Sequence, residues 1–335
     1  MEKAKFDVIC HAPQVGGCGL NCKHCWVTHN LKEHKPLDEV IHMIDGLADL
    51  YTVPALAKLV LIYFLDEITL HPDVIEILSH CRKRNVLPQQ TIATNGLGFA
   101  VRDDWEQILI EMKKCGVTGF LMAVNGDEEY HDWFTGHKGS FQNTLKATRR
   151  ANEFGFKVAW NMYLTSENVS QVTQTARTKG DDRIFFRIPS PTEKWENWSN
   201  IHPEIGILKA IPEDCKRYVT QDIKSESDWM NSILNGKITE VPSRANIGDY
   251  FECNGSTYEV RVFPEYRVDG IDYSNFGKLY SDEPFPSEST GPRSLSLKEL
   301  AMLHGDPTSN RAFTIHGLRE KFIHNHCMNQ ALARQ

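Results

Sequence analysis

The sequence lacks several features that would place the protein in a particular class. It has no lysine- or arginine-rich block and a formal net charge of -7, which argues against a nucleic-acid partner bound mainly through its phosphates. No apolar run is long enough to span a bilayer, so we expect no membrane partner. The first residues lead straight into a strand-like segment and do not form a signal peptide. The nine cysteines are an odd number, which fits a reducing compartment better than a disulfide framework and predicts a cytoplasmic protein.

The chain instead alternates short apolar runs with amphipathic segments. At 335 residues, with 41% hydrophobic and 24% charged residues, it can build a sizeable core. Apolar runs predict strands at 6–11, 59–64, 91–93, 119–124, 157–164 and 183–188. Apolar residues three and four apart predict helices starting at Pro36 and over 73–84, 103–114, 141–154 and 169–177. Six strand–helix units predict an α/β fold, a partial or closed barrel whose chemistry lies at the carboxyl ends of parallel strands.

Three cysteines lie close together directly after the first predicted strand. Cys18, Cys22 and Cys25 fall within eight positions, with glycines before and inside the loop. Thiolates are soft ligands for zinc, copper(I) and iron–sulfur clusters, and no fourth cysteine follows nearby to close a tetrahedral zinc site. Three thiolates on a four-iron cubane leave one iron open, which is typical of a metal site that does chemistry. Two alternatives are three unrelated thiols and a structural zinc completed by Cys10, His24 or His29.

This loop resembles the cluster motif of the radical S-adenosylmethionine (radical SAM) superfamily. The resemblance implies a partial (β/α)6 TIM-like barrel with a [4Fe–4S] cluster on the three cysteines. It also implies S-adenosylmethionine (SAM) as the second cofactor, bound through its amino and carboxylate groups to the open iron. Further segments in the family's order, from residue 6 to about 188, support the resemblance.

Polar residues after the later strands resemble the family's SAM-binding segments. The stretch from Phe64 to Asp73 has the acid of the family's Gly-Gly-Glu-Pro motif but neither glycine, and an anionic cup there can receive an ammonium group. Ala123 stands where a serine usually helps to hold SAM, and Thr135 replaces an arginine in a His-Asp-x-x-Arg-Gly segment. The resemblance assigns cofactor binding to His24, Leu65, Asp66, Glu67, Asn95, Ala123, Asn125 and Asn161.

The remaining chain predicts two further regions after a core barrel over residues 1–188. Residues 189–240 mix prolines, tryptophans and weak helices and are interpreted as a connecting or lid region. Residues 241–335 are interpreted as a small α+β extension that resembles the SPASM or twitch extension of the family. Its cysteines are too few for a four-cysteine auxiliary cluster, and Cys253 is the candidate hydrogen donor within it.

Together these features predict an enzyme that cleaves SAM to a 5′-deoxyadenosyl radical, which abstracts hydrogen from a substrate. With 17 residues before Cys18, we expect a small molecule of the sugar, aminocyclitol or nucleoside type. We expect a redox-neutral epimerisation, rearrangement or elimination, and an electron donor such as flavodoxin or ferredoxin. The alternatives are a peptide-modifying enzyme of the same family and a non-catalytic barrel with a structural metal.

Overall fold

The computed structural model describes most of the chain. The described residues are 6–11, 15, 17–25, 34–49, 57–64, 66–179, 183–189, 199–238, 249–253, 256–261, 295–315, 317–319, 321–322 and 325. Within these ranges no helix combines the length and the apolar character needed to cross a membrane.

Parallel strands form the wall of a partial barrel. They are β1 (Phe6–His11), β2 (Ala57–Ile62), β3 (Val86–Pro88), β4 (Thr91–Thr94), β5 (Gly119–Ala123), β6 (Lys157–Tyr163) and β7 (Ile184–Arg187). One sheet runs β3-β2-β1 and the other β4-β5-β6-β7, and every pairing among these strands is parallel.

β3 and β4 are two halves of one bent strand. Gln89 and Gln90 separate them; the Gln89 N–H donates to the carbonyl of Ile62 in β2 at 3.2 Å, and the Gln90 carbonyl accepts from the Thr118 N–H at 2.8 Å. Hydrogen bonding therefore passes from the first sheet to the second across the bend. The six predicted strands form one curved wall from β1 to β7, which confirms the partial barrel predicted from the sequence.

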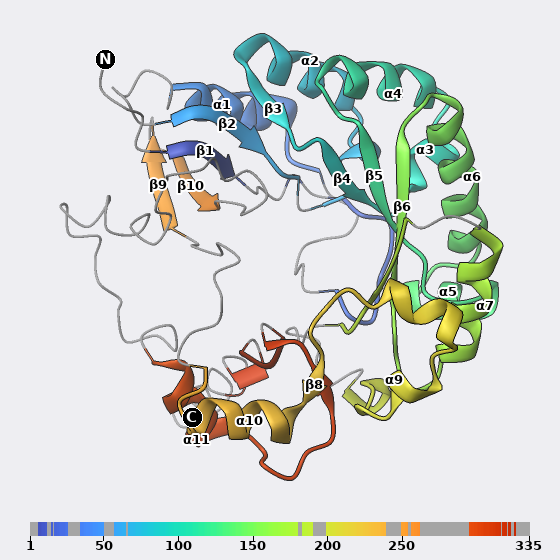
Figure 1. Ribbon diagram of the computed structural model, residues 1–335. Helices are drawn as coiled ribbons and strands as arrows, with labels where there is room; N and C mark the ends of the chain where they lie inside the picture. Colours follow the sequence, from blue (N-terminus) through green and yellow to red (C-terminus); the bar gives the residue numbers. More distant parts are fainter. Residues whose placement is uncertain are drawn as a thin grey trace, which may run out of the picture.

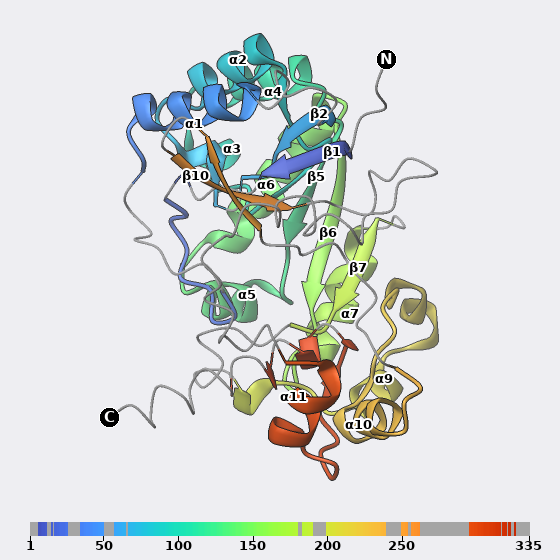
Figure 2. The ribbon, with the colours of Figure 1, turned by 90° about the vertical axis from the view of Figure 1, so that its left-hand side faces the viewer.

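Helices cover the outer side of this wall (Figure 1). They are α1 (Leu37–Asp49), α2 (Val74–Arg84), α3 (Leu97–Val101), α4 (Trp105–Lys114), α6 (Ser140–Glu153) and α7 (Val169–Lys179), with the short 3-10 helix η2 (Ile68–Leu70) after β2. Alternate strand residues, such as Val158, Trp160 and Met162 of β6, are buried in one core with apolar residues of these helices. In β4 to β7 the intervening residues, such as Ala93, Leu121 and Ala159, are only partly buried and face the inside of the arc. The further helix α5 (Glu128–Thr135) lies beyond the end of β5 (Figure 2).

A second, smaller unit lies beyond the barrel wall. It contains η3 (Ser199–Ile201), β8 (Lys224–Ser225), α10 (Glu226–Leu234), α11 (Leu297–His304) and β11 (Ala312–Phe313). The intervening α9 (Ile207–Ala210) and η4 (Glu213–Tyr218) pack on the core of the barrel. β8 pairs antiparallel with β11, and α10 and α11 lie together (Figure 2). Trp229 is buried in this unit and donates to the Phe313 carbonyl at 2.8 Å, so it is a packing residue. The segments on either side of the boundary expected near residue 240, α10 and the pair α11 and β11, share one core. The predicted domain assignment itself stays a prediction.

A hairpin from the C-terminal part of the chain extends the first sheet. β9 (Asp249–Cys253) and β10 (Ser256–Arg261) pair antiparallel, and β10 continues antiparallel onto β1, with Cys10 opposite Arg261 and His11 opposite Val260. The outer edge of β1 is therefore covered by strands that are distant in the sequence.

Candidate functional site

The cysteine loop leaves the carboxyl end of β1 and docks on the C-terminus of α5. The Asn21 N–H donates to the Thr135 carbonyl at 2.9 Å, and the Lys23 N–H donates to the Phe134 carbonyl at 3.0 Å. The last carbonyls of a helix have no partner within the helix, so the loop supplies the missing donors. Gly136 follows with φ +63, and a Cβ there would lie 3.0 Å from the Asn21 carbonyl oxygen. The helix end thus fixes the backbone of the loop at close range.

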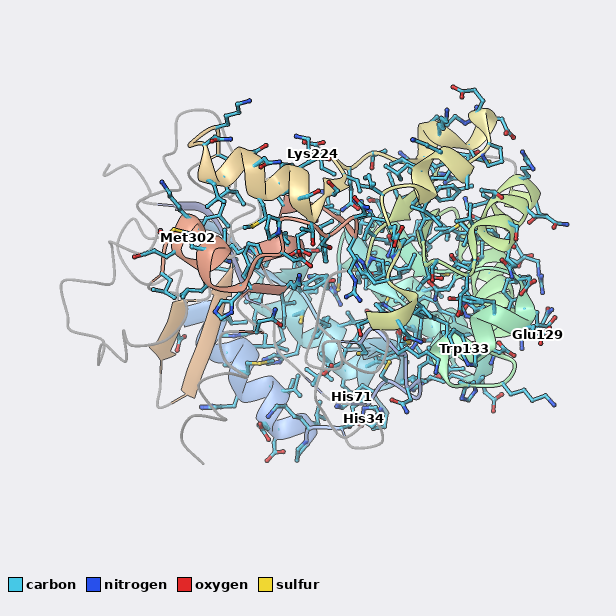
Figure 3. All side chains as sticks on the ribbon, turned by 90° about the horizontal axis from the view of Figure 1, so that it is seen from below. His34, His71, Glu129, Trp133, Lys224 and Met302 are labelled. Carbon is cyan, nitrogen blue, oxygen red and sulfur yellow. The ribbon has the colours of Figure 1, made fainter. Side chains whose placement is uncertain are left out.

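The segment that returns after the loop packs against the start of the same motif. Gly17 has φ +75, and a Cβ there would overlap the ring of His34. The His34 ring meets the His71 ring edge to face at 5.1 Å, and the two lie side by side in Figure 3. The ring of His71 accepts from the Asp73 N–H at 3.1 Å through Nδ1, so Nε2 is the atom that donates to the Lys35 carbonyl at 3.0 Å. His71 therefore holds the segment that follows the cysteine loop.

The three cysteine side chains are half-buried thiols that belong to no disulfide. After burial, the nearby Cys22 and Cys25 add to the raised pKa of Tyr163, and Cys25 adds to that of Cys18. Burial, and next the charge of Glu67, raise the pKa of the Cys18 thiol to about 12. A thiolate at this position therefore depends on a bound cation for its stability.

This arrangement differs from a site for a single metal ion. Among the described residues, no group of three or more His, Cys, Asp or Glu side chains could hold one ion. An iron–sulfur cubane needs a wider spacing between the three cysteine sulfurs, because each thiolate binds a different iron. The loop carries three thiols outside any disulfide on a backbone held by close glycine contacts.

Glu67 lies fully inside the protein at the end of the second barrel strand. Its carboxylate accepts from the Thr69 hydroxyl at 2.5 Å, from the Thr94 hydroxyl at 2.7 Å and from the Asn95 N–H at 2.6 Å. Burial raises the pKa of Glu67, and these hydrogen bonds oppose that effect. An ionised carboxylate has about four acceptor sites, so most of its capacity is used within the protein. Neighbouring Asp66 is buried as well.

Asn95 links the Glu67 network to the cysteine loop. Its side-chain amide donates to the Cys18 carbonyl at 3.0 Å and to the Cys18 sulfur at 3.3 Å. The next residue, Gly96, has φ +77, and a Cβ there would lie 2.7 Å from the Cβ of Ala147 in α6. The Thr-Asn-Gly segment therefore needs its glycine both for the backbone conformation and for close helix packing.

The inner face of the wall brings several predicted residues toward the loop. Ala123 is in register with Asn161 on the neighbouring strand, and both are partly buried. Burial raises the pKa of Tyr163, and the nearby Asn161 side chain opposes that effect. The Tyr163 ring centre lies 4.3 Å from that of His24. Arg187 is in register with Tyr163 on β7 and interacts with its hydroxyl. Tyr163 and Arg187 were missed in the sequence, although the alternating pattern of β6 and β7 places them on the inner face.

Asn125 and His131 form a buried polar pair after β5. The Asn125 N–H donates to His131 Nδ1 at 3.1 Å, so the proton of the neutral ring is on Nε2. Burial lowers the pKa of His131 to about 4, against a smaller opposite effect of Asp132. The Asn125 amide and His131 Nε2 are buried and find no hydrogen-bond partner among the described residues. Two orphaned polar groups at the carboxyl end of β5 are consistent with a site that receives a ligand.

Thr135 has a structural role in place of the expected arginine. Its hydroxyl contacts that of Ser140 at 2.6 Å, and its carbonyl holds the cysteine loop. The Asp132 carboxylate accepts from the N–H groups of Gly139 and Phe141 and so caps α6. This segment therefore positions the loop through its backbone, a role for which the side chains give no direct sequence signal.

Two of the predicted site residues cannot be placed within the site. Leu65 lies outside the described residues, as do Cys10's side chain and His29. For Cys253 the structure gives the backbone, which ends β9 opposite Ser256 near the hairpin turn. Its role stays a prediction.

Comparison with known proteins gives a consistent result. The family model described as "Radical SAM superfamily" matches residues 14–178. The AdoMet-dependent heme synthase of Methanosarcina barkeri (strain Fusaro / DSM 804) is 27% identical over 183 residues, 52% of this chain and 49% of that protein. The Fe-coproporphyrin III synthase of the same organism is 23% identical over 158 residues, 46% of this chain and 36% of that protein. The matched part spans about half, or less, of the length of these relatives.

Solved structures with a similar arrangement include native anSMEcpe with bound AdoMet. That structure has a TM-score of 0.44 and 17% identity, and the match covers 78% of this chain and 76% of the other. SuiB of Streptococcus suis, bound to its precursor peptide SuiA, has a TM-score of 0.42 and 15% identity, over 71% of this chain and 47% of the other.

Proposed function

Because the chain belongs to the radical SAM superfamily, whose members use a [4Fe–4S] cluster and SAM, we propose that it is an enzyme with its cluster on Cys18, Cys22 and Cys25. The observation that carries this proposal is the loop itself. Three thiols outside any disulfide lie on a loop that has close glycine contacts and is anchored to a helix end at the carboxyl edge of a partial barrel. When bound, the reduced cluster supplies the electron that cleaves SAM to methionine and a 5′-deoxyadenosyl radical, which abstracts hydrogen from the substrate.

The chain's own residues would bind and orient the two ligands. We assign SAM contacts to the groups around the loop, namely His24, Leu65, Asp66, Glu67, Asn95, Ala123, Asn125 and Asn161. Asp66 and Glu67 lie where an ammonium group would be received, although the Glu67 carboxylate is already engaged by Thr69, Thr94 and Asn95. We therefore give the direct ammonium contact to Asp66 and the support of that contact to Glu67.

The substrate we propose is a small molecule, of the sugar, aminocyclitol or nucleoside type, in a redox-neutral reaction. The C-terminal part of the chain has too few cysteines for a conventional auxiliary cluster, so a route for a second electron is not evident. An epimerisation, rearrangement or elimination needs no such route. Peptide modification within the same family remains the alternative.

One observation favours a second class of small molecule. The inner face of β4 to β7 is largely apolar, with Ala93, Leu121, Ala159 and Phe185 among its partly buried residues and Arg187 near the carboxyl end. An apolar wall with one cationic end suits a flat apolar molecule that carries carboxylates. The two curated relatives are named for heme and Fe-coproporphyrin III synthesis, so a tetrapyrrole is the second candidate.

An electron donor such as flavodoxin or ferredoxin would reduce the cluster, and we propose a cytoplasmic location. The six cysteines whose side chains are described form no disulfide, which supports a reducing compartment. No nucleic-acid partner is expected from the net charge of -7.

The test of the activity uses protein whose cluster has been reconstituted without oxygen. We expect about four irons per chain, a reduced-state electron paramagnetic resonance spectrum that changes on addition of SAM, and formation of 5′-deoxyadenosine. Cys18→Ala, Cys22→Ala and Cys25→Ala should each lose all three. Cys215→Ala, at a buried thiol outside the loop, is the matched control and should keep them. Full iron content in any of the three loop variants would refute the assignment.

The substrate class is tested by binding. Titration with Fe-coproporphyrin III, followed by absorbance, is compared with titration by a nucleoside and by an aminocyclitol. Arg187→Met should weaken porphyrin binding if the tetrapyrrole candidate holds. Tight binding of the polar ligands alone would favour the first candidate.

A further inference from the structure

We infer that Asn95 is a positioning residue that sets the reduction potential of the cluster through a hydrogen bond to the sulfur of Cys18. This inference rests on the proposal that Cys18 is a cluster ligand. The amide nitrogen of Asn95 is 3.3 Å from the Cys18 sulfur and 3.0 Å from the Cys18 carbonyl oxygen. One amide group thus holds both the side chain and the backbone of the first cysteine.

The amide is locked in the orientation that this hydrogen bond requires. Its oxygen accepts from the Leu97 N–H at 2.8 Å, so the NH2 group has to face Cys18. The Asn95 backbone is held as well, because its N–H donates to Glu67 at 2.6 Å and its carbonyl accepts from the Thr144 hydroxyl at 3.1 Å. The donor cannot turn away without breaking several contacts, so it stays aimed at the sulfur.

Hydrogen bonds to ligand sulfurs are among the factors that set the potential of an iron–sulfur cluster. A reduced cluster carries one more negative charge than the oxidised one, and part of that charge is on the thiolates. A donor aimed at Cys18 therefore stabilises the reduced state more than the oxidised state. The negative charge of the nearby Glu67 carboxylate has the opposite effect, because it disfavours the reduced cluster. The hydrogen bond from the Asn95 N–H partly offsets that charge.

The experiment compares midpoint potentials of reconstituted protein without SAM, in titrations with dithionite followed by electron paramagnetic resonance. Asn95→Asp keeps the acceptor for Leu97 but loses the donor and adds a charge, whereas Asn95→Leu loses the donor without a charge. Both should shift the potential to more negative values. Asn152→Asp, at an exposed position of α6, makes the same substitution away from the loop and should match the wild type.

The outcomes separate the hydrogen bond from its alternatives. A wild-type potential in Asn95→Leu would overturn the inference, and so would a shift confined to Asn95→Asp, because charge alone would then explain it. Iron content and circular dichroism establish first that each variant folds and holds one cluster; Asn95→Ala replaces the leucine variant if that variant fails. If the wild type itself holds no cluster on these cysteines, the proposed function fails together with the inference. If the Asn95 variants hold a cluster but their midpoint potential equals that of the wild type, only the role of Asn95 is refuted and the proposed function stands.

Discussion

The backbone N–H of Asn95 donates to the buried carboxylate of Glu67 at 2.6 Å, and this bond joins the ends of the second and third barrel strands. Glu67 is 3% exposed, and its other partners, Thr69 and Thr94, come from the same two strand ends. The buried acid that we assign to support the ammonium contact thus also organises the loops around it. Its substitution should affect both the fold and the ligand.

We predict that Glu67→Gln lowers the free energy of unfolding by about 1–3 kcal/mol, because the new amide NH2 faces donors in a buried site. SAM affinity should fall by about ten- to a hundredfold, because the buried charge that supports the Asp66 contact is lost. Urea unfolding and calorimetric titration of the loaded protein measure the two effects. Glu76→Gln, at an exposed position of α2, is the control. Wild-type values of both quantities in Glu67→Gln would contradict this role.

Gly136→Ala should impair the docking of the cysteine loop. The position has φ +63, and the added Cβ would lie 3.0 Å from the Asn21 carbonyl oxygen. We expect lower iron content after reconstitution, together with a loss of about 1 kcal/mol in stability from the left-handed backbone. Gly116→Ala is a closely matched control, since Gly116 has φ +84 and its Cβ would meet nothing within 4 Å. Equal iron content in the two variants would show that the contact does not matter.

The buried His131 predicts a pH dependence of stability. Burial lowers its pKa from 6.5 to about 4, so below pH 6.5 the unfolded chain binds a proton that the folded protein does not. Stability should therefore fall as the pH drops from about 6.5 to about 4, by about 3 kcal/mol from this residue. In His131→Gln, urea unfolding at several pH values should show a shallower slope across this window. His42→Gln, at an exposed position of α1, should keep the wild-type slope.

Cys253→Ala tests the proposed hydrogen donor. If Cys253 returns a hydrogen atom to the substrate radical, the variant should still form 5′-deoxyadenosine but no longer form product. Iron content near the wild-type value provides the control for an intact cluster. Unchanged product would remove Cys253 from the mechanism, and iron near eight per chain, as for two cubanes, would contradict the single-cluster proposal.

The sequence predicts the barrel well because its signals are local. The apolar run at 59–64 becomes β2, and the alternating 157–164 segment becomes β6 with three side chains in the core. The helix α5 was missed because it is short, although Asp127 provides an N-cap signal through its bond to the Tyr130 N–H at 3.0 Å. The bend between β3 and β4 was also missed, because it depends on which neighbour each half pairs with.

The site was predicted less completely than the barrel, because its contacts join residues that are distant in sequence. Cysteine spacing and the asparagine at a strand end are visible in sequence, but the partner of each group is not. Thr135 was interpreted as a lost arginine, whereas the structure uses its backbone carbonyl, which every residue possesses. Likewise, the contact between Glu67 and Thr94 joins residues on different strands, and no local pattern indicates it.

The β9–β10 hairpin has a consequence for how the protein is made. Cys10 and Arg261 are separated by about 250 residues, and contacts this distant in sequence form late and slowly. During synthesis, the backbone groups at the outer edge of β1 stay unpaired while the rest of the barrel is made. Such an edge is a template for pairing between chains. The hairpin therefore protects the nascent barrel from aggregation only after residues 249–261 have been synthesised, and the exposed edge is open to aggregation in the interval before that.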